Sequence, residues 1–174
     1  MSILGLVLLI YAGILFLRGN AALKQNSLQL KPRKIKPRIA ILVAARDESK
    51  VIAGLLESIQ RQTVNVPPED VYVIVETLDD PTVQICKRYH NTVILREDLN
   101  KQRKGYALDE AIRQILARDR HYDAYFIFDA DNILSEDYLE EMLKIYAAGY
   151  EIATGYRNSK NGNTNVISAV SSLT

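Results

Sequence analysis

Two carboxylates, Asp129 and Asp131, stand one residue apart directly after the apolar run Tyr125-Phe126-Ile127-Phe128. That run is typical of a buried strand, and a regular extension of it would place both acids on the same side. Neighbouring carboxylates repel each other unless a cation neutralises them. Oxygen ligands suit Mg2+ or Mn2+, with a phosphate completing the shell. The pattern predicts a metal-diphosphate site; the alternative is two solvated loop acids that cap the next helix.

A second candidate segment follows the apolar run of residues 38–44 and reads Ala44-Ala45-Arg46-Asp47-Glu48. Small side chains let the backbone approach a ligand closely, and Arg46 or the amides at a helix start could meet a phosphate. An ordinary strand-to-helix turn is the alternative here.

Acidic residues also follow the apolar run of residues 71–75, beginning with Glu76. A carboxylate in this place can accept hydrogen bonds from a base N–H or from ribose hydroxyls. Asp79 and Asp80 have another interpretation as the cap of the following helix, and for Asp80 we favour the cap.

Three cations, Lys101, Arg103 and Lys104, come just before Gly105 at the start of a predicted helix. Positive charges there oppose the helix dipole, so they are poorly placed for stability alone. An anionic ligand would offset that cost. A solvated basic loop is the competing interpretation.

The elements that must position these residues alternate along the chain. Apolar runs predict strands at residues 38–44, 71–75, 92–95 and 125–128, with a possible fifth at 151–154. Helical spacing predicts helices at residues 51–59 (with Ser49 available as a cap), 81–89, 106–117 and 136–147. Alternation of this kind predicts an α/β fold with a mostly parallel, doubly wound, Rossmann-like sheet. Ligands bind outside the carboxyl ends of such strands, where all the candidates fall.

Composition limits the function. The 174 residues suffice for one domain of ordinary size, and a 25% charged content with a net charge of +1 fits a globular protein and gives no support to nucleic-acid binding. The single cysteine, Cys86, excludes an internal disulfide and fits a reducing compartment. Its apolar neighbours indicate a packing role.

The N-terminus is apolar: residues 3–17 carry no charge. A bilayer core needs about 20 apolar residues, with about 17 as the lower bound. The run reaches this bound when Met1, Ser2 and the aliphatic stem of Arg18 are counted with it. No basic region precedes the run, which argues against a cleaved signal peptide. We expect residues 1–18 to be a transmembrane anchor; the alternative is a helix in the protein's own core.

Residues 19–37 form a basic linker beside the membrane. The apolar run is followed, up to residue 37, by Arg18, Lys24, Lys31, Arg33, Lys34 and Lys36, and the first acid in the chain is Asp47. Because basic segments stay on the cytoplasmic side, we expect residues 38–174 to form a domain at the cytoplasmic face of the cell membrane.

Four segments in this order, Ala45-Arg46-Asp47-Glu48, residues 76–82, Lys104-Gly105-Tyr106-Ala107-Leu108 and Asp129-Ala130-Asp131, resemble the motifs of family 2 glycosyltransferases. Such enzymes have the GT-A fold and transfer a sugar from a nucleotide-diphosphate donor to an acceptor. The resemblance covers residues 38–157, and its specificity lies in the order of the motifs at successive strand ends.

The resemblance implies that the backbone near Ala44 and Ala45, with Glu48, holds the nucleoside. Glu76 matches the acid that contacts uracil, which favours a UDP-sugar donor, although aspartate is commoner there. Ala44 stands where proline is usual.

At the other strand end, the resemblance implies that Lys104 lies near the donor and that Asp129 touches ribose or metal. Asp131 would ligate the divalent cation, Mn2+ or Mg2+, that bridges the diphosphate.

Family members also carry an acidic catalytic base well downstream of the D-x-D motif, which is Asp129-Ala130-Asp131 in this chain. Here no acid follows Glu151. We therefore expect the base beyond Thr174 and the chain to be the donor-binding portion of a longer, membrane-anchored hexosyltransferase with an unknown acceptor. A non-catalytic nucleotide-sugar-binding remnant is one alternative. A second is a haloacid dehalogenase-like phosphatase, in which Asp129 would be the nucleophile.

Overall fold

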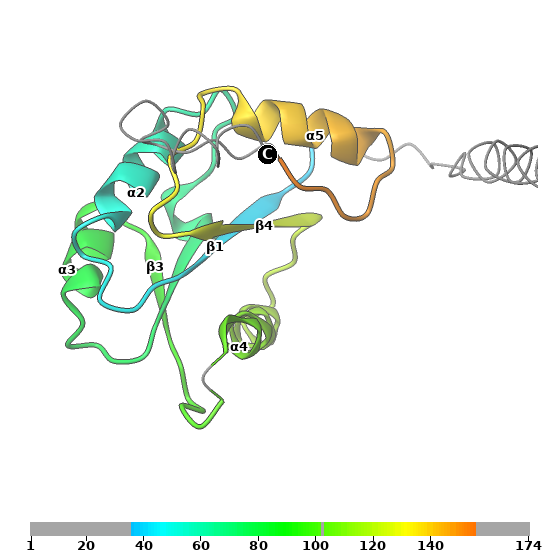
Figure 1. The fold of residues 1–174 in the computed structure, drawn as a ribbon. Coiled ribbons are helices and arrows are strands. Elements are labelled where there is room, and N and C mark those ends of the chain that lie inside the picture. The colour runs from blue at the N-terminus through cyan, green and yellow to red at the C-terminus, as the bar shows by residue number, and fades with distance from the viewer. Residues whose placement is uncertain (1–35, 102, 156–174) are drawn as a thin grey trace, which may run out of the picture. The chain divides into compact units, whose positions relative to one another are not determined.

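The computed structural model describes residues 36–101 and 103–155. Strands and helices alternate along this part of the chain, as the sequence predicts (Figure 1). The elements are β1 (Ile39–Ala44), α2 (Ile52–Gln60), the short 3-10 helix η1 (Pro68–Asp70), β2 (Val71–Val75), α3 (Pro81–Arg88), β3 (Thr92–Leu95), α4 (Lys104–Ala117), β4 (Ala124–Asp129) and α5 (Tyr138–Ala147).

Four parallel strands form one sheet in the order β3-β2-β1-β4. The register pairs Ala44 with Ile74 on one side and with Asp129 on the other, and Val75 with Leu95. The carboxyl ends of all four strands therefore meet at one edge of the sheet, where ligands of parallel sheets bind.

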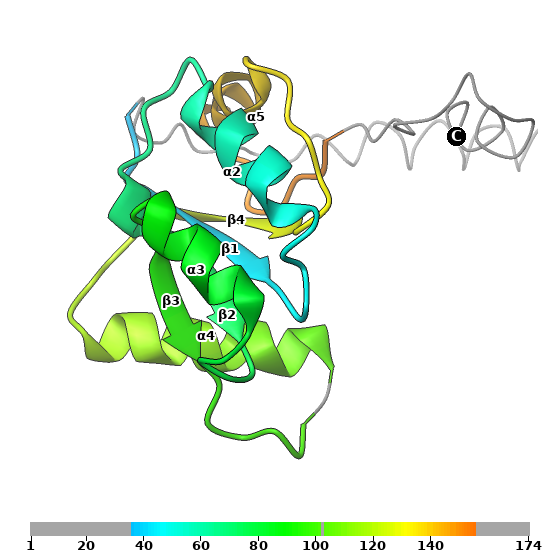
Figure 2. The same cartoon turned by 90° about the vertical axis from the view of Figure 1, so that its left-hand side faces the viewer.

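Helices cover both faces of the sheet, which confirms the doubly wound arrangement. Side chains of β1 alternate between two cores: Ile41 and Val43 pack with α2, α3 and α5, whereas Ala40 and Leu42 pack with α4. Figure 2 shows α4 on the opposite side of the sheet from α2 and α5. Because both faces are covered, all four side chains are fully buried, as continuous apolar runs predict.

The helix starts agree with the sequence in one case and differ in another. Asp80 is the N-cap of α3, and its side chain accepts a 2.8 Å hydrogen bond from the Thr82 N–H, as predicted. The prediction that Ser49 caps α2 was wrong. The N-cap is Val51, without a side-chain hydrogen bond, and the Glu48 carbonyl accepts from the Val51 and Ile52 amides instead.

The fifth strand predicted at residues 151–154 was also wrong. Among the described residues no strand follows β4, and the Ile152 side chain is 92% exposed. An apolar run becomes a strand only where a neighbouring strand offers its backbone, and this run pairs with none of the four strands.

The predicted anchor (residues 1–18) lies outside the described residues, as does nearly all of the basic linker. Within residues 36–101 and 103–155, no helix has both the length and the apolar character needed to cross a bilayer. Cys86 is fully buried, and burial raises the pKa of its thiol to about 11. A thiol that stays protonated at neutral pH fits the predicted packing role.

Candidate functional site

The carboxyl edge of the sheet brings three candidates from separate segments together. Ala44, at the end of β1, pairs with Asp129 on β4, and Glu76 follows the last residue of β2 on the other side. Neighbouring strands lie about 4.8 Å apart, so the ends of β2 and β4 flank β1 at a separation of about 10 Å. A nucleoside is long enough to bridge that distance.

Lys104 and Asp129 meet across this edge. Lys104 is the first residue of α4, and its Nζ forms an ion pair with Oδ1 of Asp129 at the end of β4. Both side chains are partly exposed, at 41% and 46%. A ligand at the edge can therefore reach both groups.

The D-x-D segment does not continue as a regular extension of β4, contrary to the prediction. Asn132 closes a turn: its N–H donates to the Asp129 carbonyl, and its Oδ1 accepts from the Asp129 N–H, each at 3.0 Å. Ala130 is buried, whereas Asp131 is exposed and its Oδ1 accepts a long hydrogen bond (3.4 Å) from the Asn132 side chain. The two hydrogen bonds between Asn132 and Asp129 close the turn that follows β4.

Glu76 is held between two arginines. The Nε of Arg46 lies 3.5 Å from its Oε2, and the Nη1 of Arg96 lies 3.5 Å from its Oε1. The sequence analysis did not single out Arg96, although a charged residue directly after a buried strand at the ligand edge was a signal that could have found it.

The loop after β1 is fixed at both ends. Ala45 is buried, and its N–H donates to the Ile74 carbonyl at 2.9 Å, so the backbone of this candidate residue continues the sheet. Asp47 adopts a positive φ of 54°, which an aspartate tolerates better than most residues. The backbone of this loop thus continues the sheet at Ala45 and turns at Asp47.

The start of α3 supports that loop. The Asp47 N–H donates to Oδ2 of Asp80 at 2.9 Å, and the Glu48 N–H donates to the Thr82 hydroxyl at 3.2 Å. Burial alone would raise the pKa of Asp80, but hydrogen bonds with Thr82 and the Asp47 amide outweigh it and lower the pKa below its ordinary value of 3.8. Asp80 is both a helix cap and an anchor of the Ala44–Glu48 segment.

Replacing Asp80 with alanine should lower the free energy of unfolding by about 1–2 kcal/mol, because the α3 cap and the loop anchor are lost together. A carboxylate with a depressed pKa stabilises the fold above its ordinary pKa and loses that effect as the pH falls through the lowered value. The difference from the wild type should therefore shrink below about pH 4. Urea unfolding at pH 7 and pH 3 measures both effects.

Asp79→Ala is the matched control, since Asp79 is exposed and is not the cap. It should change stability by less than about 0.5 kcal/mol. Equal losses in the two variants would contradict the role given to Asp80.

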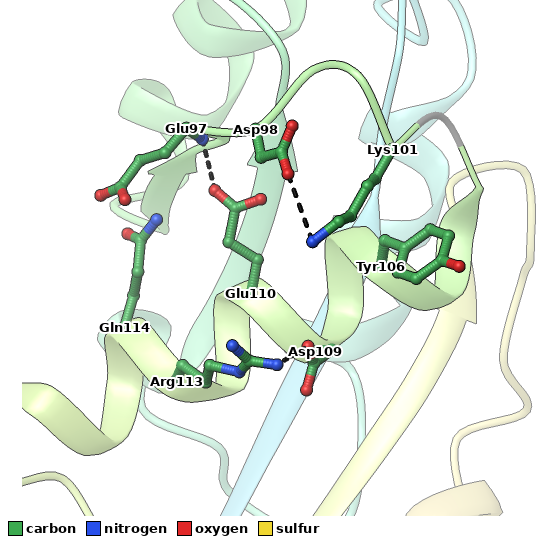
Figure 3. A pocket seen from close by; sticks show the side chains of 8 residues that line it. All are labelled: Glu97, Asp98, Lys101, Tyr106, Asp109, Glu110, Arg113 and Gln114. Carbon is green, nitrogen blue, oxygen red and sulfur yellow. Dashed lines mark hydrogen bonds and ion pairs between the residues drawn. The ribbon is translucent and has the colours of Figure 1, made fainter.

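The remaining predicted cations differ in their placement. Lys101 forms a 3.3 Å ion pair with Asp98 and lies over the ring of Tyr106, and Arg103 is the N-cap of α4 without a side-chain cap bond. Figure 3 shows Lys101 in a pocket between the β3–α4 loop and α4, lined by Glu97, Asp98, Lys101, Tyr106, Asp109, Glu110, Arg113 and Gln114. In this pocket Lys101 pairs with Asp98, and Arg113 pairs with Asp109. Of the three predicted cations, Lys104 is the one with an ion pair to the D-x-D segment among the described residues.

The donor set at the edge fits a divalent cation that is shared with a phosphate ligand. Within the described residues, no three His, Cys, Asp or Glu side chains are grouped so as to enclose a metal ion. Mg2+ and similar cations commonly use only one or two carboxylates, with phosphate oxygens and water completing the shell. The exposed Asp131 and the neighbouring Asp129 supply that number.

Two solved structures are similar to the chain, and the first of them supports the fold. The mannosyltransferase PcManGT of Pyrobaculum calidifontis is similar over 79% of this chain and 40% of its own, with 19% identity and a TM-score of 0.52. Residues 1–349 of S. aureus TarS are similar over 64% of this chain and 31% of that one, with 23% identity and a TM-score of 0.46. The chain thus spans less than half the length of these structures.

Sequence comparison gives the family. No curated protein sequence matches the chain. Residues 37–174, however, match the family described as glycosyltransferase like family 2, and this match covers most of the chain. With a parallel α/β sheet consistent with the GT-A-like fold and the motif residues at its carboxyl edge, the chain belongs to glycosyltransferase family 2.

Proposed function

We propose that the chain is the donor-binding portion of a hexosyltransferase that binds a nucleotide-diphosphate sugar, UDP-linked, and transfers the sugar to an acceptor. The observation that carries the proposal is the convergence at one sheet edge: Glu76 and Asp129 flank the end of β1, and Lys104 reaches Asp129 from α4. Family membership favours this proposal over the haloacid dehalogenase-like alternative.

Each residue has a task in the proposal. The backbone at Ala44 and Ala45, with Glu48, holds the nucleoside, and Glu76 accepts a hydrogen bond from the base. Small side chains permit this approach, and the supported loop after β1 keeps its shape before the ligand arrives. Lys104 places a positive charge where the donor's diphosphate would lie.

Asp131, with Asp129, would hold Mn2+ or Mg2+ at the diphosphate. The bound metal would neutralise the charge that develops on the leaving diphosphate. PcManGT was solved with GDP-Man and Mn2+, which supports a nucleotide-diphosphate sugar and a divalent cation as the ligands here. We assign no catalytic base among the described residues, since a base for the acceptor hydroxyl must lie at the acceptor.

Calorimetric titration of the full chain with UDP, in Mn2+ and then in EDTA, tests the proposal. We expect binding that is markedly tighter in Mn2+. Equal affinity in the two media would overturn the role of the D-x-D. Absence of UDP binding in both would overturn the proposed function itself.

Residues 1–18 are proposed as a membrane anchor that leaves the domain at the cytoplasmic face. The support is the uncharged run of residues 3–17 followed by the basic linker. A reporter fused after Lys36 should be protected from protease added to intact cells and become sensitive after the membrane is permeabilised. Cleavage in intact cells would reverse the orientation.

A further inference from the structure

Arg96 is a buried cation at the same sheet edge. It comes directly after β3, and its N–H donates to the Val75 carbonyl at 3.0 Å, one residue beyond the paired strands. Its side chain is only 4% exposed. Burial of an arginine is costly unless its charge is paired and its donors are used, so its partners indicate what the residue does.

The guanidinium joins three separate segments. Nη2 donates to the carbonyls of Asp98 (2.8 Å) and Lys101 (2.5 Å) in the β3–α4 loop. Nη1 contacts Oε1 of Glu76 at 3.5 Å, and Nε lies 3.7 Å from Oε2 of Glu110 on α4. Nε makes no hydrogen bond within the described residues. Arg96 therefore connects the end of β2 to the loop that leads into α4.

The two oxygens of Glu76 have unequal partners. Oε1 contacts the buried Arg96, whereas Oε2 contacts Arg46, whose side chain is 72% exposed. Exposed ion pairs contribute little to stability, while separating a buried pair leaves an uncompensated charge. A ligand that needs a carboxylate oxygen would displace Arg46 from Oε2 and leave Arg96 on Oε1.

We propose that Arg96 is a positioning residue for nucleobase recognition: it fixes Oε1 of Glu76, so that Oε2 exchanges Arg46 for a ring N–H of the base. The inference rests on the proposed function. Uracil presents an N3–H to a carboxylate, whereas N3 of cytosine is an acceptor whose lone pair would face it. A carboxylate held in one orientation discriminates between uracil and cytosine, whereas a carboxylate that is free to rotate discriminates between them poorly.

Because Arg96 also holds two carbonyls of the β3–α4 loop, its replacement could act through the loop alone, and the test must distinguish the two effects. General loosening of the β3–α4 loop would weaken UDP and CDP binding alike, because the two nucleotides share their ribose and diphosphate. Only an effect transmitted through Glu76 changes the ratio of the two affinities. The ratio is therefore the readout that a merely structural role would not move.

The experiment measures UDP and CDP affinity of the full chain in Mn2+ for the wild type, R96Q, R96K and R46Q. The wild type should prefer UDP by at least about tenfold, the range for one hydrogen bond to a charged group. R96Q should reduce the preference at least about fivefold, since the hydrogen bond to Oε2 loses its fixed geometry. R46Q should keep the preference.

R96K replaces R96Q in this experiment if thermal unfolding shows that R96Q does not fold. A lysine keeps the charge but cannot replace the planar guanidinium at Glu76 and both carbonyls, so its preference should lie between those of the wild type and R96Q. An unchanged preference in R96K, or equal weakening of UDP and CDP in R96Q, would overturn the positioning role alone. A loss of preference in R46Q equal to that in R96Q would do the same. Failure of the wild type to bind either nucleotide would overturn the proposed function and this inference together.

Discussion

Replacing Asp131 with asparagine should remove the dependence of UDP binding on Mn2+. Asparagine keeps the size of the side chain but loses the charge that would hold the cation. Asp131 is exposed, and the hydrogen bond that it accepts from the Asn132 side chain is long, so the substitution should leave the fold intact. Affinity for UDP in Mn2+ should fall by about tenfold or more, the usual scale for disturbing a metal site, while affinity in EDTA should not change.

Asp137→Asn is the matched control for this experiment. Asp137 is also exposed, and it is the N-cap of α5 without a side-chain cap bond. Its replacement removes one negative charge from the same loop and should leave the metal dependence intact. Metal dependence that survives in the Asp131 variant, or that is lost in both variants, would refute the assignment. Asp129 is less suited to this test because its replacement also breaks the ion pair with Lys104.

Replacing Asp70 with asparagine should destabilise the domain by about 1–3 kcal/mol, the range for leaving the partners of a buried hydrogen-bonding group unsatisfied. The Asp70 side chain is 3% exposed and lies at the amino edge of the sheet, opposite the candidate site. Its Oδ1 accepts from Arg38 and Arg120, each at 3.1 Å. Without the carboxylate, two guanidinium groups would lose their shared counter-charge.

A hydroxyl pair extends the Asp70 cluster. The Tyr122 hydroxyl donates to Asp70 Oδ1 at 2.5 Å and lies 2.7 Å from the Tyr72 hydroxyl. Burial, together with hydrogen bonds to Asp70 and Tyr72, raises the pKa of Tyr122, so this hydroxyl remains a donor at neutral pH. The cluster ties the start of β1 to β2 and to the loop before β4.

Urea unfolding of Asp70→Asn and Asp119→Asn measures this effect. Asp119 is 96% exposed and has a positive φ of 55°, which asparagine also tolerates, so its replacement should stay within about 0.5 kcal/mol of the wild type. A loss below about 1 kcal/mol in the Asp70 variant would contradict the account of the cluster, since a typical single hydrogen bond alone contributes that much.

Much of the fold could be predicted from local pattern. The runs at Ile39–Ala44 and Val71–Val75 are continuously apolar because both faces of a parallel sheet are covered. A short, continuously apolar run therefore predicts a buried strand. Asp80 was predictable as a cap because its partner, Thr82, is two residues away. The order of strand ends then placed Glu76 and Asp129 at one edge.

Other features depend on contacts between distant segments, and a sequence pattern does not say which side chains will meet. Arg96 meets Glu76 across 20 positions, and Lys104 meets Asp129 across 25. The turn that follows β4 is closed in part by the side chain of Asn132, which an apolar run does not reveal. Residues 151–154 have the composition of a strand, but whether a run pairs is decided by its neighbours in space.

The central claim, that the nucleotide diphosphate binds at the carboxyl edge of the sheet, is tested most directly by paramagnetic broadening. Amide resonances of the full chain would be recorded with Mn2+ and UDP, and with Mg2+ and UDP as the diamagnetic reference. Strand β1 spans roughly 17 Å from one edge of the sheet to the other. We predict the strongest broadening at Ala44, Ala45 and Asp129, decreasing along β1 towards Arg38. Broadening that is uniform, or strongest near Arg38, would contradict the claim.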